Sequence, residues 1–251
     1  MKKITEYLRD YFTIIKEGAT WKDKIILLMY FLGIPKRMFM RMIKKEYKPL
    51  LMSDVTIKNK DGIFFCGSSF LVAQGAISIY EPENKKYFNI ERGVFVDIGA
   101  NIGRYAVMQA RKLHEGKVIA IEPMPKDFKI LKKNISLNRL KNIIPIEIAC
   151  SDKKGNADFW LGAEGEGTAH SLFEIKNRSR KIRVKTDTLD NIIRDLKIKR
   201  VDLMKVDVEG AEPNVFRGAK KILGEYHPRI IFEALSSKKL KECRKELQKF
   251  N

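Results

Sequence analysis

Two carboxylates and a glycine-rich turn are the residues of this 251-residue sequence best suited to chemistry. Asp97 follows an apolar run at residues 94–96 and opens the pattern D-x-G-x-N-x-G, which ends at Gly103. Glu122 follows the next apolar run, at residues 118–121. Glycine permits a sharp turn and the close approach of a ligand, and the helix predicted after Gly103 presents free N–H groups. This layout indicates a site for a nucleoside-type cofactor.

The details favour S-adenosylmethionine (SAM) over a dinucleotide. The dinucleotide fingerprint G-x-G-x-x-G places a glycine where the pyrophosphate approaches, whereas here Asn101 lies between Gly99 and Gly103. SAM has no phosphate. It needs a turn for its zwitterionic amino-acid tail and a carboxylate that accepts from two ribose hydroxyls. We assign the tail to Asp97 and the turn at 99–103, and the ribose to Glu122. A tight turn in an ordinary α/β domain is the alternative explanation for the glycines.

Strands and helices alternate along the rest of the chain. Apolar residues at helical spacing cover 126–138, and apolar runs at 143–149, 201–206 and 229–232 predict three further strands. The alternation predicts a doubly wound parallel sheet with its ligand site at the carboxyl ends of the strands. Acids fall at or just past the predicted strand ends, and so on one rim of the sheet: Asp97, Glu122, Asp152, Asp207 and Glu233.

Six segments resemble the FkbM family of SAM-dependent methyltransferases. They are YEPE (80–83), VFVDIGANIGRY (94–105), VIAIEPMPKDFKILKKNISLN (118–138), IACSDKKGNADFW (148–160), VKTDTLDNII (184–193) and VDLMKVDVEGAEPNVFRGAKKIL (201–223). The DVEGAE segment is fairly specific to the family, whereas DIGAN occurs in many methyltransferases. The resemblance implies a class I, Rossmann-like methyltransferase fold and methyl transfer to a hydroxyl, often on a sugar or a secondary metabolite.

The resemblance also extends the expected cofactor site. It implies that Glu81 lies over the cofactor tail, and analogy with the fold places Ser151 and Asp152 beside the adenine, where a simple turn is an equal alternative. The expected cofactor-binding residues are Glu81, Asp97, Gly99, Ala100, Asn101, Gly103, Glu122, Pro123, Ser151, Asp152 and Asp207.

Methyl transfer to a hydroxyl needs the two reactants in line, and it gains from a base or a metal ion that acts on the hydroxyl proton. The candidates are Asp207, Glu209, Glu212 and His170. Of these we expect Asp207 or Glu209, which follow the strand beside the cofactor strand, to act as the base or to orient the acceptor. His170 lies in a glycine-rich segment that could close over the site, and an exposed loop histidine is the alternative. A divalent cation between Asp207 and Glu233 suits carboxylate chemistry, although the spacing does not require one.

The N-terminal 50 residues differ from the rest, with 12 Lys and Arg against five Asp and Glu. Thr20 and Asp23 predict a capping box that opens a helix, and the apolar run at 25–32 is shorter than the roughly 20 residues of a membrane span. This helix either packs on the domain or lies at a membrane surface beside a lipid-linked acceptor.

We divide the chain into a basic helical extension (1–50), a short β-rich lead-in (51–90) and a methyltransferase domain (91–251). Short strands are expected in the lead-in at 55–57, 63–65 and 77–80. Class I methyltransferases usually close their sheet with a C-terminal hairpin, and this sequence leaves no room for it. The strand at 229–233 is then an apolar edge. We expect either that the chain is a truncated form, or that the N-terminal segment or a partner, such as a second copy, covers this edge.

The net charge of +19 attracts anions such as nucleic acid, acidic lipid head groups and charged glycans. RNA methylation is therefore a rival interpretation, although residues 207–210 read D-V-E-G where an adenine amino-methyltransferase carries an Asn/Asp-Pro-Pro-aromatic loop. A non-catalytic SAM-binding or scaffold protein is the third interpretation.

Three scattered cysteines favour a reducing compartment, so we expect a cytoplasmic protein, with contact to the membrane surface through residues 1–50 as an alternative. The acceptor is expected to be a small molecule or a glycan- or lipid-linked group.

Overall fold

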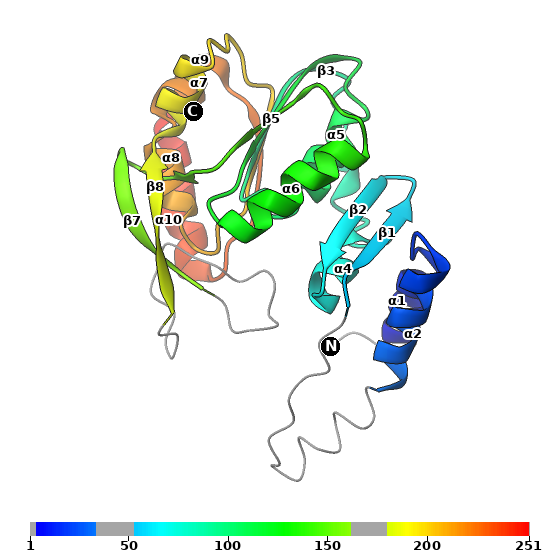
Figure 1. Ribbon diagram of the computed structural model, residues 1–251. Coiled ribbons are helices and arrows are strands. Elements are labelled where there is room, and N and C mark those ends of the chain that lie inside the picture. The colour runs from blue at the N-terminus through cyan, green and yellow to red at the C-terminus, as the bar shows by residue number, and fades with distance from the viewer. Residues whose placement is uncertain (1–3, 34–52, 162–179, 251) are drawn as a thin grey trace.

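A five-stranded parallel sheet forms the centre of the computed structural model, which describes residues 4–33, 53–161 and 180–250 (Figure 1). The strand order is β10-β9-β3-β4-β5, and each neighbouring pair is parallel. Because the chain runs from β3 to β4 and β5 on one side, and later to β9 and β10 on the other, the order reverses at β3. This is the predicted doubly wound topology. The strands are β3 (Arg92–Ile98), β4 (Glu115–Ile121), β5 (Ile143–Ile146), β9 (Leu203–Val206) and β10 (Arg229–Phe232).

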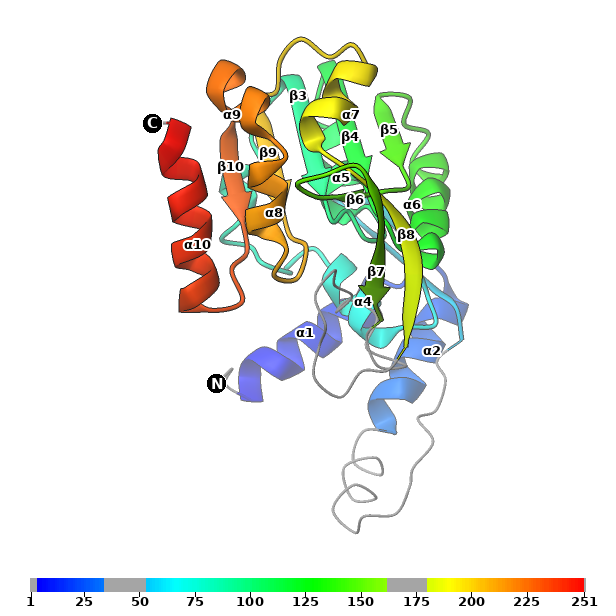
Figure 2. The same ribbon diagram turned by 90° about the vertical axis from the view of Figure 1, so that its left-hand side faces the viewer.

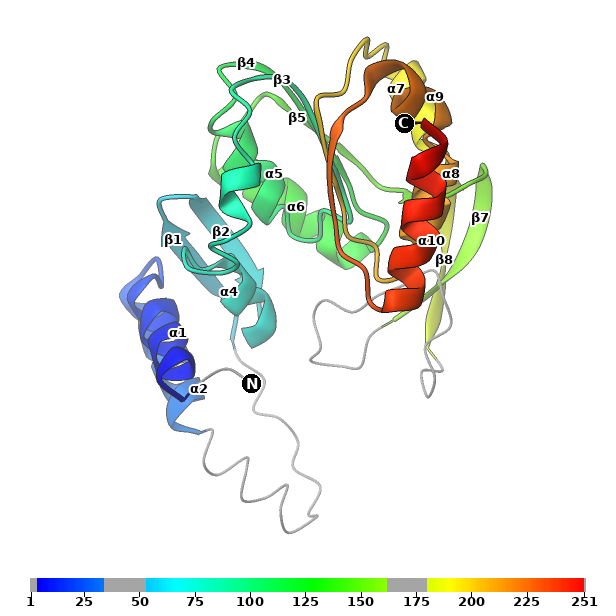
Figure 3. The ribbon, with the colours of Figure 1, turned by 180° about the vertical axis from the view of Figure 1, so that it is seen from behind.

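Helices cover both faces of this sheet because successive side chains of a strand point to opposite sides. In β3, Phe95 packs on one side, whereas Val94, Val96 and Ile98 pack on the other. Helices α5 (Arg104–Ala110) and α6 (Pro125–Leu137) contribute to the Phe95 side. The second side is covered by α7 (Leu189–Asp195), α8 (Glu212–Arg217), α9 (Lys220–Tyr226), α10 (Ser237–Leu247) and η2 (Gln248–Phe250), as Figure 3 shows from behind.

The N-terminal helices extend the core on the α5 side. The predicted capping box is confirmed: the Asp23 N–H donates to Thr20 Oγ1 (3.2 Å), and the Thr20 N–H donates to Asp23 Oδ2 (2.8 Å). It opens α2 (Trp21–Leu32), which follows α1 (Ile4–Lys16). Ile14 and Leu27 belong to the same hydrophobic cluster as Phe95, so the helix pair packs on the domain. The domain division at residues 50 and 90 stays a prediction.

Two of the three strands expected in the lead-in are present, and they pair as a hairpin of β1 (Val55–Asn59) with β2 (Gly62–Gly67). The strand expected at 77–80 is wrong. A helix, α4 (Phe70–Ala76), occupies the preceding residues and ends in turns that lead to η1 (Lys85–Tyr87). The physical reason is that Ser69 caps α4, accepting from the Val72 N–H (3.3 Å), and Phe70, Ala73 and Ala76 share its buried face.

The strand predicted at 143–149 divides in two. The chain leaves the main sheet after Ile146 at the exposed Glu147, and β6 (Ala149–Cys150) joins β7 (Gly155–Trp160) and β8 (Lys181–Asp187) in a second sheet of order β6-β8-β7. One long apolar run therefore supplies two sheets.

Among the described residues, β10 has no neighbour other than β9, so it is the edge strand that the sequence predicts. Its side chains are nevertheless partly covered. Phe232 packs edge-on against Phe216 of α8, with ring centroids 5.5 Å apart, and Ile231 packs against the opposite core. The unpaired groups at this edge belong to the backbone of β10.

Candidate active site

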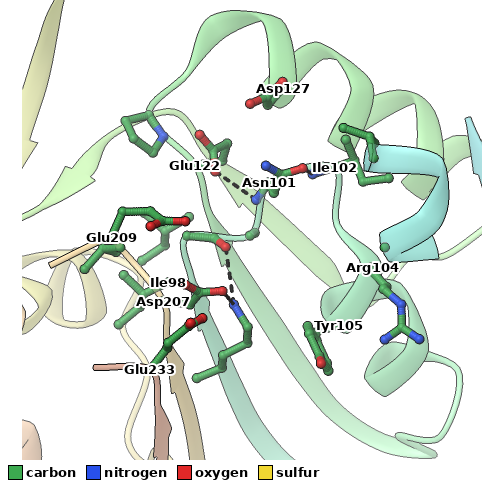
Figure 4. Close-up of a pocket in the computed structure, with 18 of the residues that line it drawn as sticks. Ile98, Asn101, Ile102, Arg104, Tyr105, Glu122, Asp127, Asp207, Glu209 and Glu233 are labelled. Carbon is green, nitrogen blue, oxygen red and sulfur yellow. Dashed lines mark hydrogen bonds and ion pairs between the residues drawn. The ribbon is translucent and has the colours of Figure 1, made fainter. Parts of the chain in front are cut away.

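A pocket of about 380 Å³ lies where the carboxyl ends of β3, β4, β9 and β10 meet, next to the point where the strand order reverses (Figure 4). Segments far apart in the sequence line it: Glu81 from the lead-in, residues 99–102 after β3, Glu122 after β4, Asp207 after β9 and Glu233 after β10. This is the position at which open α/β sheets bind their ligands.

The turn after β3 brings two backbone segments into contact. Gly99 has φ +77°, and a Cβ on this residue would lie 1.8 Å from the carbonyl oxygen of Asp207. Gly103, the N-cap residue of α5, has φ +87°, and a Cβ there would lie 2.4 Å from Leu131 Cδ1. Both positions therefore require glycine. Gly99 forms part of the pocket wall, whereas Gly103 packs α5 against α6 and does not line the pocket.

Glu122 organises the floor of this turn. Its Oε2 accepts from the Asn101 N–H (2.8 Å) and its Oε1 from the Met124 N–H (2.8 Å), as Figure 4 shows for Asn101. Burial, followed by the nearby charge of Asp127, raises the pKa of Glu122 to about 8. Each carboxylate oxygen of Glu122 can accept a second hydrogen bond. Its position in the wall is therefore compatible with accepting from the two hydroxyls of a ribose.

Asp97 lies beneath the turn and is fully buried. It is opposite Lys205 in the register of β3 with β9, and Lys205 Nζ is 3.6 Å from Asp97 Oδ1. Neither oxygen of Asp97 has a hydrogen-bond partner in the described part of the chain. Burial raises the pKa of Asp97 to about 6, although the charge of Lys205 opposes this shift. A buried carboxylate without hydrogen bonds leaves acceptor capacity for a cationic or hydrogen-bonding ligand.

Lys205 joins this acid to the pocket wall. Its Nζ is also 3.1 Å from Asp207 Oδ2 and 5.3 Å from the centre of the Tyr105 ring. Burial disfavours the charge of Lys205, but the carboxylates of Asp207 and Asp97 together outweigh burial and raise the pKa of Lys205 above its ordinary value. Lys205 therefore remains a cation at neutral pH, which makes it a positioning group and not a proton acceptor.

Further acids face the same space. Glu81, with φ +43°, accepts a hydrogen bond from the Tyr105 hydroxyl. Burial, followed by the charges of Asp207 and Glu81, raises the pKa of Glu233. Figure 4 shows Asp207, Glu209 and Glu233 along one side of the pocket. These positions confirm the expected rim of acids for Asp207 and Glu233 at the ends of β9 and β10.

The turn that carries Glu209 is held by a buried acid. Glu212 Oε1 accepts from the N–H groups of Val208 (3.2 Å) and Gly210 (3.0 Å), and Glu209 between them has φ +53°. Glu212 is almost fully buried and does not line the pocket. The acids of the D-V-E-G-A-E segment thus divide into two that face the pocket and one that fixes the turn.

The pocket is acidic although the chain is strongly basic. Six carboxylates line it, against the two cations Arg104 and Lys205, while the whole chain has a net charge of +19. The acids are Glu81, Glu122, Asp127, Asp207, Glu209 and Glu233. A site of this kind attracts a cationic ligand and disfavours an anionic one.

The structure brings most of the predicted site residues together. The lining includes Glu81, Gly99, Ala100, Asn101, Glu122, Pro123, Asp207 and Glu209. It reaches residues 148–150 and Phe159, and it does not include Ser151 or Asp152. Asp152 instead lies 3.8 Å from Arg217, and residues 151–154 form the turn between β6 and β7. His170 lies outside the described residues.

The pocket lining also contains polar and charged residues that the sequence did not predict, among them Arg104, Tyr105 and Lys205. The signal for Lys205 was present, because a lysine inside the apolar run at 201–206 needs a carboxylate partner if the strand is buried. Arg104 is buried between the pocket and the lead-in, where it donates to the carbonyl of Ile77 (3.0 Å) and lies 3.6 Å from Asp61. Its role depends on the fold of residues 61–80, which the sequence did not predict.

No group of three or more His, Cys, Asp or Glu side chains within residues 4–33, 53–161 and 180–250 is arranged to hold a metal ion. The proposed bridge between Asp207 and Glu233 thus has no third ligand of these types there, and metal dependence stays a question for experiment.

Comparison with known proteins places this site in a family. The family model described as "Methyltransferase FkbM domain" matches residues 97–251. "Methyltransferase sdnD" of Sordaria araneosa is 28% identical over 167 residues, which cover 55% of this chain and 64% of the relative. "2-O-methyltransferase NoeI" of Sinorhizobium fredii is 28% identical, with 59% and 65% covered. "Hexuronic acid methyltransferase AglP" of Haloferax volcanii is 28% identical, with 53% and 52% covered.

The chain spans just under two thirds of the first of these relatives and about half of the last. The family match begins at Asp97, and it includes the turn at 99–103, Glu122 and the D-V-E-G turn after β9. The match covers more than half of the sequence, and the chain belongs to the methyltransferase FkbM domain family.

Proposed function

We propose that this protein is a SAM-dependent methyltransferase that methylates a hydroxyl of a sugar, a glycolipid or a small metabolite. The observation that carries the proposal is the acidic pocket of a basic chain, built around the glycine turn and Glu122 at the reversal point of the sheet. Its chemistry complements a ligand with two cationic groups and a ribose diol, which SAM has.

The residues present fit SAM. Glu122 would hold the ribose, because both of its oxygens keep acceptor capacity beside the turn. The backbone at 99–101 would receive the amino-acid tail, and the carboxylate of Asp97, buried beneath this turn, would favour the cationic end of the tail. The apolar part of the wall, which includes Ala149 and Phe159, suits a nucleobase.

SAM would supply a methyl group made electrophilic by the sulfonium. The chain's task is then to hold the acceptor hydroxyl in line and to accept its proton. Asp207 and Glu209 are our candidates for this role, as the sequence predicts. Glu233 is a third, because burial and the charge of Asp207 raise its pKa and so make its ionised carboxylate a stronger base. His170 stays a prediction for the same role.

A hydroxyl acceptor is supported by the name of one relative, a 2-O-methyltransferase, and a sugar acceptor by the name of another, a hexuronic acid methyltransferase. The rival reading, RNA methylation, draws support from the net charge of +19. The six carboxylates of the pocket oppose it, since they would repel a phosphate chain close to the reacting groups. We therefore favour a sugar or metabolite hydroxyl.

Calorimetric titration with SAM tests the cofactor. We expect Glu122→Gln to weaken SAM binding at least about tenfold, because the amide has one acceptor oxygen where the carboxyl group has two, and a hydrogen-bonding group left without a partner costs about 1–3 kcal/mol. Glu115→Gln is the matched control, since Glu115 begins the same strand and is exposed. Equal affinity of Glu122→Gln and the wild type would remove Glu122 from the site.

Transfer of a radiolabelled methyl group to glycans, glycolipids and tRNA tests the acceptor. Label in a glycan or glycolipid supports the proposal, and label in tRNA alone favours the rival reading. SAM binding with no transfer to any acceptor would favour a non-catalytic SAM-binding protein. Activity after treatment with EDTA decides whether a divalent cation takes part.

A further inference from the structure

The helix α2 is apolar on two opposite sides. Its inner side packs on the domain through the buried Leu27 and the partly buried Ile26 and Tyr30. Its outer side carries Trp21, Ile25, Leu28, Met29 and Leu32, all of them exposed, and we name these five residues the outer stripe. Trp21 is 82% exposed. A helix at the surface of a soluble domain normally has polar residues on this side.

The outer stripe is continuous along the helix. Relative to Trp21, its members follow at the fourth, seventh, eighth and eleventh positions, which lie on one face of an α-helix. Lys22 is the exposed charged residue beside it on α2. Exposed apolar residues that gather on one face, in contrast to scattered ones, mark a surface that meets a partner or a membrane.

The charges of the helix pair identify the kind of partner. Three of the four acids in residues 4–33 are engaged on the inner side. Asp10 is buried, Asp23 accepts from the Thr56 N–H (2.9 Å), and Glu17 accepts from the Ser78 N–H (2.9 Å). The exposed charged residues of the pair, in contrast, are the cations Arg9, Lys16 and Lys22. The pair therefore presents positive charge together with the outer stripe.

The sequence beyond α2 has the same sign. Residues 34–52 contain six Lys and Arg and one Glu. A two-fold contact between copies of this chain would bring like charges of the two helix pairs together, which disfavours a second copy on this face. A partner with an anionic surface and an apolar interior could pair with the cations and also bury the apolar side chains of the outer stripe.

We propose that the outer stripe of α2 docks onto the surface of an anionic lipid bilayer. An exposed tryptophan and aliphatic side chains, flanked by Lys and Arg, are the composition of helices that lie in the interface of a membrane. None of the helices in the described ranges is long and apolar enough to cross a membrane. The contact is thus a peripheral one, with α2 lying along the bilayer.

The helix that carries the outer stripe packs on α4, which contributes to the pocket wall. Figure 2 shows α1, α2 and α4 beyond the carboxyl ends of the strands. Residues that follow these ends line the pocket. Tyr30 of α2 stacks on Phe70 of α4, with ring centroids 4.5 Å apart, and the exposed Leu71 of α4 lines the pocket. Resting on the proposed function, this arrangement favours a lipid-linked acceptor.

Vesicle binding tests the docking without SAM or an acceptor, so it is independent of the proposed function. The full chain is mixed with vesicles of phosphatidylglycerol and phosphatidylcholine, or of phosphatidylcholine alone, and sedimented. We expect sedimentation with the anionic vesicles, and at least about tenfold weaker partition for Ile25→Ser/Met29→Ser, which removes two apolar side chains. Leu235→Ser, a change at an exposed leucine outside the helix pair, is the control.

Tryptophan fluorescence locates the contact. The chain has two tryptophans, Trp21 and Trp160, so Trp160→Phe leaves Trp21 as the reporter. We expect a blue shift of Trp21 emission on anionic vesicles, and quenching by brominated lipid. Sedimentation without a shift would place the contact elsewhere and overturn the proposal. Failure of the wild type to sediment with anionic vesicles would also overturn the proposal. If, in addition, the wild type were a dimer and Ile25→Ser/Met29→Ser a monomer, the outer stripe would be assigned to contact with a second copy.

Discussion

Lys205 and Asp97 face each other on neighbouring parallel strands, both buried, with Lys205 Nζ 3.6 Å from Asp97 Oδ1. The lysine also reaches Asp207 at 3.1 Å, so one cation serves an acid below the glycine turn and an acid in the pocket wall. A change at Lys205 should therefore alter both the stability of the sheet and the net charge of the pocket wall.

Lys205→Met should lower the free energy of unfolding by about 3 kcal/mol at pH 7, because it leaves the Asp97 carboxylate buried without a cation. Denaturant unfolding measures this. The double variant Lys205→Met/Asp97→Asn should recover part of the loss, since it removes the uncompensated charge. If the loss of unfolding free energy in the double variant equals the sum of the losses in Lys205→Met and Asp97→Asn, the two side chains do not interact.

The stability contributed by Glu122 should fall as the pH rises from about 4.5 to 8. The pKa of Glu122 is about 8 in the folded protein against an ordinary 4.5, so between these values the folded protein holds a proton that the unfolded chain has lost. The expected slope is up to about 1.4 kcal/mol per pH unit. Unfolding at several pH values measures it, and Glu122→Gln should flatten the curve. The same slope in Glu122→Gln would assign the titration to another group.

Gly99→Ala should unfold the site, since the added Cβ would meet the Asp207 carbonyl oxygen at 1.8 Å and φ is +77°. We expect a loss of several kcal/mol in unfolding free energy, or no soluble protein. Gly75→Ala is the matched control, because nothing lies within 4 Å of a Cβ there and the residue is inside α4. It should be neutral or stabilising by about 0.5–1 kcal/mol. Equal melting temperatures of Gly99→Ala and the wild type would contradict the close contact.

Asp207→Asn should reduce methyl transfer by at least about a hundredfold if its carboxylate accepts the acceptor proton. Glu209→Gln and Glu233→Gln, assayed beside it, separate the three candidates. Formation of the demethylated cofactor measures turnover, and calorimetry with SAM shows whether the cofactor still binds. Turnover lost together with SAM affinity would point to a binding role for the substituted residue.

Much of the fold could be predicted because its signals are local. Buried strands such as 94–98 appear as continuous apolar runs, and the acids that follow them mark the carboxyl rim of the sheet. The capping box at Thr20 and Asp23 is likewise contained in four consecutive residues. Gly99 could be placed in a turn, although its contact with Asp207 could not, because that contact joins positions 108 residues apart.

The remaining parts of the site depend on packing between distant segments. Ile77 and Tyr80 have a strand-like composition, yet their carbonyl oxygens accept from Arg104, and Ser69 instead begins a helix before them. The run at 143–149 is uniformly apolar apart from Glu147, so nothing local shows that it is shared between two sheets. Pairing of Lys205 with Asp97 requires the strand order, which the sequence gives only by analogy.

The excess of carboxylates around the pocket also bears on how a spent cofactor would leave. On donating its methyl group, a sulfonium becomes a neutral thioether, so the molecule in the pocket loses one positive charge. The six acids in the wall would then hold the product less strongly than the donor. The electrostatics of this cavity would thereby favour exchange of product for fresh donor after each turnover.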